Sequence, residues 1–63
     1  MKITITINCD NAAFDDNPRP EIARILSEQA KKVRFYPLDG LAEPFEIRDV
    51  NGNIVGQFAV ETN

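Results

Sequence analysis

Three acids and an amide cluster within eight residues near the start of the 63-residue chain, and they are the first candidates for chemistry. They are Asp10, Asp15, Asp16 and Asn17. Their side-chain oxygens are the ligands that Ca²⁺ prefers, but an EF-type loop spaces them at alternate positions around a central glycine and closes on a glutamate. Here no glycine is present, and residues 12–14 are apolar. We therefore expect a capped loop and no metal site.

The chain offers little for acid–base or nucleophilic catalysis. It has no histidine and one cysteine, which excludes a histidine proton relay, a histidine or multi-cysteine zinc site and an internal disulfide. Cys9 has Asn8 and Asp10 as neighbours, so we expect a small buried hydrophobe in place of a reactive thiol. Ser27 lies inside a predicted helix, and the three glycines are isolated from one another. We expect no enzymatic activity and no cofactor.

Charge is unevenly distributed along the chain, and this is the main functional hint. The net charge of −3 opposes general nucleic-acid binding, which depends on basic groups at phosphates. Residues 18–34 carry five bases against two acids, whereas residues 35–63 carry five acids against one base. This is either a dipole that steers the protein onto a charged partner or a solvated surface whose bases suit the helix dipole. The candidate interaction surface is Arg24, Glu28, Lys31, Lys32, Arg34 and Tyr36.

The elements that position these residues follow from the spacing of apolar side chains. Residues 2–8 alternate polar and β-branched apolar residues, which predicts a strand with Ile3, Ile5 and Ile7 on its buried face. Residues 9–18 are rich in turn formers and predict a loop, with Phe14 tucked beneath it or a short helical turn in its place.

Residues 19–34 predict the one long helix, because their apolar residues lie three and four positions apart. The predicted buried stripe is Ile22, Ile25, Leu26, Ala30 and Val33. Asp16 or Asn17 can cap the helix, and Glu28 can pair with Lys32. In the connection at 35–44, we expect Phe35 and Tyr36 to close the core; a contact surface is the alternative.

Residues 45–61 predict a β-hairpin. The dipeptide Asn51-Gly52 accepts positive φ at both central positions of a two-residue turn. That turn gives three cross-strand pairs, which are Val50–Asn53, Ile47–Gly56 and Phe45–Phe58. Alternation then places Ile54 in the core and Val55 on the outer face. A glycine opposite Ile47 either leaves room for the helix to approach or marks a bulge.

Together these elements predict a single α+β domain over residues 1–63, with the element order β-α-β-β. The sheet has three strands, is mainly antiparallel and has the order 1-3-2, with the helix packed on one face. A parallel contact between the first two strands is the alternative. No segment approaches a membrane span or a signal peptide, so we expect a cytoplasmic protein without membrane contact. We expect a monomer or a weak edge-paired homodimer.

Three segments carry a resemblance to known proteins. They are residues 1–7 (MKITITI), residues 10–14 (DNAAF) together with 23–26 (ARIL), and residues 48–56 (RDVNGNIVG). In these segments the chain resembles a group of short proteins encoded in tailed phages and prophages. The resemblance implies a viral or prophage accessory protein in the bacterial cytoplasm, and it attaches no activity.

Three functions remain open from the sequence. The first is a non-enzymatic module that binds a host or viral protein. The second is weak nucleic-acid binding by the basic helix face with Tyr36. The third is an acidic mimic of nucleic acid built from Asp39, Glu43, Glu46, Asp49 and Glu61.

Overall fold

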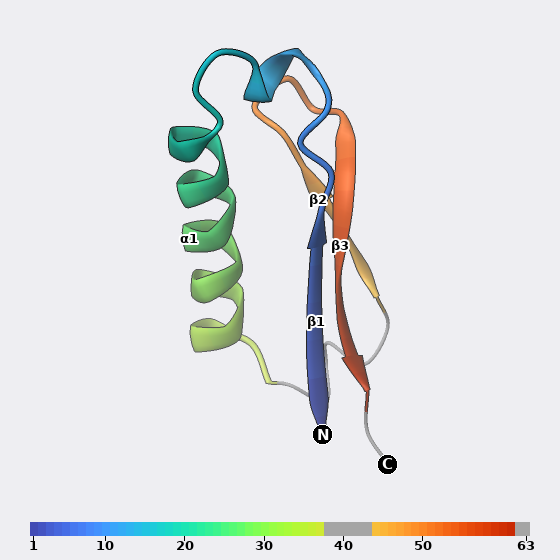
Figure 1. The fold of residues 1–63 in the computed structure, drawn as a ribbon. Coiled ribbons are helices and arrows are strands. Elements are labelled where there is room, and N and C mark those ends of the chain that lie inside the picture. Colours follow the sequence, from blue (N-terminus) through green and yellow to red (C-terminus); the bar gives the residue numbers. More distant parts are fainter. Residues whose placement is uncertain (38–43, 62–63) are drawn as a thin grey trace.

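The computed structural model describes residues 1–37 and 44–61 and shows one helix lying along one face of a three-stranded sheet (Figure 1). The elements are β1 (Lys2–Ile7), the 3₁₀ turn η1 (Ala12–Phe14), α1 (Arg19–Phe35), β2 (Phe45–Arg48) and β3 (Ile54–Glu61). The sheet order is β1-β3-β2, and β3 is antiparallel to both neighbours. The predicted α+β fold is confirmed, and the parallel alternative is wrong.

The central strand β3 lies against β1 without an intervening side chain at Gly56. Gly56 is opposite Ile7 on β1 and opposite Ile47 on β2. A Cβ at Gly56 would overlap the carbonyl oxygen of Thr6 and would lie 3.1 Å from the Cα of Ile7. Of the two predicted reasons for this glycine, room for the helix is therefore wrong, since the backbone of β1 occupies the space.

The turn between β2 and β3 differs from the predicted type. The amide of Asp49 donates to the carbonyl of Asn53 at 2.9 Å, and the amide of Gly52 donates to the carbonyl of Asp49 at 3.0 Å. Of the described residues in this turn, only Gly52 has positive φ, at 85°. The loop therefore contains three residues, which is the form with a left-handed residue at its end. The Asp49 carboxylate favours this form because it accepts from the amides of Asn51 and Asn53.

A register shift in the hairpin reverses the predicted faces of two residues. Phe45 lies opposite Phe58 and Ile47 opposite Gly56, as predicted, but Arg48 lies opposite Ile54. The extra residue is Val55, which is 6% exposed, whereas Ile54 is 56% exposed. A bulge inserts one residue and so inverts the alternation beyond it, which explains why the period-two prediction is wrong for both side chains.

The core is concentrated where α1, η1 and the hairpin meet. Its buried apolar members are Phe14, Ile25, Ile47, Val55, Phe58 and Val60. Phe14 is held there by η1, which is the short helical turn expected as one of two forms of this loop. The Asn11 side chain caps this turn by accepting a hydrogen bond from the amide of Ala13. Phe45 stacks on Phe58 with 4.9 Å between ring centroids.

The helix begins at Arg19, and its N-cap position is Pro18, which provides no side-chain bond. The Asn17 side chain accepts from the amide of Arg19 at 3.3 Å, so Asn17 takes the capping role predicted for it or Asp16. The predicted pair of Glu28 with Lys32 does not form, because Lys32 turns toward the sheet. Glu28 pairs with Lys31 instead, at 3.7 Å.

Candidate functional site

The predicted interaction surface divides between residues used inside the fold and residues left exposed. Arg24 binds Glu21 through two hydrogen bonds of 2.7 and 3.0 Å, and it also donates to the carbonyl of Arg48 at 3.2 Å. The ammonium group of Lys32 lies 4.4 Å from the centroid of the Phe45 ring, in the range of a cation–π contact. Both residues therefore help to join α1 to β2.

The other members of that surface lie in solvent. Glu28 and Lys31 form an exposed pair, and Arg34 and Tyr36 are exposed at the end of α1, as is the neighbouring Phe35. The prediction that Phe35 and Tyr36 close the core is therefore wrong, because the two side chains are 71% and 61% exposed. Exposed pairs of this kind contribute little to stability.

A buried carboxylate, Glu21, anchors the start of α1 to the hairpin turn. One oxygen accepts from Arg24, and the other accepts from Arg24 and from the amide of Val50 at 2.7 Å. The hydrogen bond from Arg24 lowers the pKa of Glu21 below its ordinary value of 4.5, against the burial that raises it. Every oxygen of Glu21 has a donor, so this group is structural.

A second buried carboxylate, Asp49, organises the turn itself. Its Oδ1 accepts from the amides of Asn51 and Asn53, and its Oδ2 accepts from the side chains of Asn11 and Asn53. Burial raises the pKa of Asp49, but these donors together lower the pKa below its ordinary value of 3.8. Because the carboxylate is buried, it does not belong to an exposed acidic surface.

These anchors turn α1 away from the orientation that its apolar stripe predicts. The buried helix residues are Glu21, Ile25 and Gln29, spaced four apart, and two of them are polar. At 100° per residue, this buried row lies roughly 80° around the helix from the centre of the predicted apolar stripe. The contacts of Glu21 with Val50 and of Lys32 with Phe45 hold the helix in this rotation.

The rotation leaves an apolar groove open between α1 and β1, which we call the β1 groove. It is lined by Ile3, Ile5, Leu26, Gln29, Ala30, Val33 and Phe58. Leu26 is 45% exposed and Val33 is 41% exposed, while Ile3 and Ile5 are 42% and 38% exposed. The prediction that these four side chains belong to the core is therefore wrong. The signal in the sequence is the width of the apolar stripe on the helix. The stripe is wider than the part of the helix surface that the three-stranded sheet covers.

Gln29 lies at the floor of the β1 groove. Its side chain is 4% exposed, and its Oε1 is buried with no hydrogen-bond partner among the described residues. Buried polar atoms in folded proteins almost always have a partner. Gln29 also lines a second hollow, between α1 and β2, and its Oε1 is closed to solvent.

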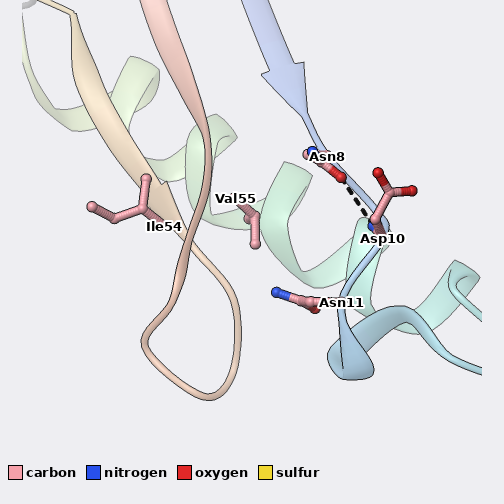
Figure 2. Close-up of a pocket in the computed structure, with 5 residues that line it drawn as sticks. All are labelled: Asn8, Asp10, Asn11, Ile54 and Val55. Carbon is pink, nitrogen blue, oxygen red and sulfur yellow. Dashed lines mark hydrogen bonds between the residues drawn. The ribbon is translucent and has the colours of Figure 1, made fainter.

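A polar hollow lies at the other end of β1, between the loop that follows it and the hairpin (Figure 2). Its lining is Asn8, Asp10, Asn11, Ile54 and Val55. The side chain of Asn8 accepts from the amide of Asp10 at 3.0 Å, which is a local turn contact. Cys9, in the same loop, is exposed, so the prediction that it is buried is wrong: the strand ends at Ile7 and the alternation does not continue.

Within residues 1–37 and 44–61, no three cysteine or acidic side chains are grouped so as to hold a metal ion. In the same part of the chain, α1 is too short and too polar to cross a membrane, and no other helix could do so. No family model, curated protein or solved structure matches the chain.

Proposed function

We propose that this protein is a small non-enzymatic interaction module that binds another protein, as an accessory protein of a phage or prophage in a bacterial cytoplasm. The observation that carries the proposal is the β1 groove. An apolar groove beside a sheet edge is typical of surfaces that bind a protein segment. The phage part of the proposal rests on the resemblance of residues 1–7, 10–14 with 23–26, and 48–56.

The exposure of the groove residues is also contrary to the burial that the sequence pattern predicts for them. A helix stripe of aliphatic residues is normally covered, and each half-exposed side chain such as Leu26 or Val33 leaves apolar area in water. Places where the folded structure goes against sequence patterning are often functional sites. This supports a partner that covers the stripe.

The two alternative functions have less support. Nucleic-acid binding by the helix would use Arg24, Lys31, Lys32, Arg34 and Tyr36. Two of these side chains, Arg24 and Lys32, are engaged with Glu21 and Phe45. An acidic mimic would use Asp49, which is buried under its own donors. Asp39 and Glu43, two further acids of that proposed surface, lie outside the described residues.

The test is affinity capture from bacterial lysate with three baits: the wild-type protein, Leu26→Gln and Ser27→Gln. Ser27 is exposed and outside the groove, so Ser27→Gln controls for the added amide. We expect a stoichiometric protein that binds the wild type and Ser27→Gln and is lost with Leu26→Gln. No such protein, or micromolar binding of a labelled single-stranded oligonucleotide at low salt, would contradict the proposal.

A further inference from the structure

We propose that the β1 groove binds an extended segment of the partner as a fourth strand on the open edge of β1, with apolar side chains at alternate positions and acidic residues at its ends. This inference rests on the proposed function, and it specifies the chemistry and conformation of what is bound. The first observation that supports it is that no other described strand pairs with the outer edge of β1.

Among the described residues, the backbone groups on the outer edge of β1 have no strand beside them. The amide of Asn8 donates to the carbonyl of Val55 at 2.6 Å, so the backbone groups of Asn8 face β3. In an antiparallel pair the direction alternates residue by residue, so Thr6, Thr4 and Lys2 also face β3. The amides and carbonyls of Ile3, Ile5 and Ile7 then face outward, and no other described strand pairs with them.

The side chains of the same residues favour a strand over any other occupant. Residues of an added strand that lie opposite Ile3 and Ile5 place their side chains on the same face of the sheet. That face is the one covered by α1, so those side chains enter the groove beside Leu26, Ala30 and Val33. One partner segment would therefore pair with the outer backbone groups of β1 and cover the apolar stripe together.

The other sheet edge lacks this combination. β2 contains four residues, of which Glu46 and Arg48 are charged and paired with each other at 2.8 Å. A register shift lies between Ile47 and Arg48. Short length, charge and a bulge all protect an edge from pairing, whereas β1 carries Lys2 as its one charge.

Charge distinguishes a foreign segment from a second copy of this chain. Helix periodicity places Arg19 and Arg34 on the flank of α1 that carries Leu26 and Ala30. The helix acids Glu21 and Glu28 lie on the other flank, paired with Arg24 and Lys31.

The lining of the groove is apolar apart from Gln29, and the bases Arg19 and Arg34 lie outside that lining, on the same flank of the helix. A two-fold pairing of β1 with its own copy would bring these bases toward each other, which like-charge repulsion disfavours. A segment with acidic ends is complementary.

The apolar lining of the groove and the two nearby bases define the expected sequence of the segment. We therefore expect apolar residues at alternate positions, with aspartate or glutamate at one or both ends.

The test is selection of a displayed library of random ten-residue peptides against the wild-type protein, with each enriched peptide then measured against three variants. Ile5→Pro removes an outward amide without removing a bond to β3, and Leu26→Gln makes the groove polar. Ser27→Gln is the matched control.

We expect an enriched pattern of alternating apolar residues with acidic ends, and binding at least tenfold weaker to Ile5→Pro and Leu26→Gln but unchanged by Ser27→Gln. Circular dichroism of each variant verifies that it is folded.

Three results would overturn the inference. Peptides whose binding is unaffected by the groove variants, or whose apolar residues repeat every three to four positions as in a helix, would leave the proposed function standing and remove the strand mechanism. A dominant dimer of the wild-type protein in sedimentation equilibrium at tens of micromolar, abolished by Ile5→Pro, would assign the edge to a second copy. Failure to enrich any peptide, together with failure of the lysate capture, would remove both proposals.

Discussion

Replacing Gly56 by alanine should strongly destabilise the fold, because the new methyl group has nowhere to go. A Cβ there would overlap the carbonyl oxygen of Thr6 and would lie 2.7 Å from its carbonyl carbon. These atoms belong to the backbone of the paired strand, so relief requires β1 and β3 to separate along several residue pairs. Overpacking of a well-packed site typically costs about 1–3 kcal/mol. Because the obstacle here is backbone, we expect Gly56→Ala to lower the free energy of unfolding by about 3 kcal/mol.

That loss is a large fraction of the total. At about 0.05–0.15 kcal/mol per residue, a chain of this size has a free energy of unfolding of about 3–9 kcal/mol. With an m-value of about 1 kcal/mol/M in urea, the unfolding midpoint of Gly56→Ala should fall by about 3 M. The assay is urea unfolding followed by far-ultraviolet circular dichroism.

The matched control is Gly52→Ala in the hairpin turn. A Cβ at Gly52 would meet no atom within 4 Å, but the φ of this residue is 85°, so alanine there meets only the left-handed backbone penalty of about 1–2 kcal/mol. We therefore expect a smaller loss for Gly52→Ala than for Gly56→Ala. A midpoint for Gly56→Ala equal to that of the wild type, or above that of Gly52→Ala, would refute the close approach of the strands.

Three further predictions concern the turn and its anchors. Gly52→Val should lower the unfolding free energy by about 1–3 kcal/mol, because a β-branched residue resists positive φ; an unchanged melting temperature would exclude this turn. Glu21→Ala should cost about 1–3 kcal/mol by leaving the Val50 amide without an acceptor, whereas Glu28→Ala, which removes an exposed pair, should change stability by less than about 0.5 kcal/mol in the same urea assay. Because the folded-state pKa values of Glu21 and Asp49 lie below 4.5 and 3.8, their contribution to stability should be complete at neutral pH and lost as the pH falls through those lowered values; a urea midpoint that does not fall in acid would contradict the buried carboxylate network.

Much of the fold was predictable because it depends on local patterns. Strict alternation in residues 2–8 and the apolar pairs Phe45–Phe58 and Ile47–Gly56 specify the sheet, and the structure confirms its order. The position of Phe14 was predictable for the same reason, since a lone aromatic residue in a polar loop needs cover.

The parts that were missed depend on contacts between distant residues. The bulge that buries Val55 accompanies a turn shaped by the Asp49 side chain, and alternation alone gives no sign of it. The rotation of α1 depends on the hydrogen bond from the Val50 amide to Glu21, 29 positions away. Because the β1 groove results from that rotation, the apolar stripe of the helix indicated burial where the structure has an open surface.

Amide hydrogen exchange of isotopically labelled protein tests most directly whether the outer backbone edge of β1, which no other described strand covers, is open to a partner. In the free protein the amides of Ile3 and Ile5 should exchange much faster than those of Thr4 and Thr6, which face β3. Addition of an enriched peptide should slow exchange at Ile3 and Ile5 and leave Thr4 and Thr6 nearly unchanged. Equal protection of all four amides in the free protein, or no added protection at Ile3 and Ile5 when the peptide is bound, would contradict strand addition at this edge.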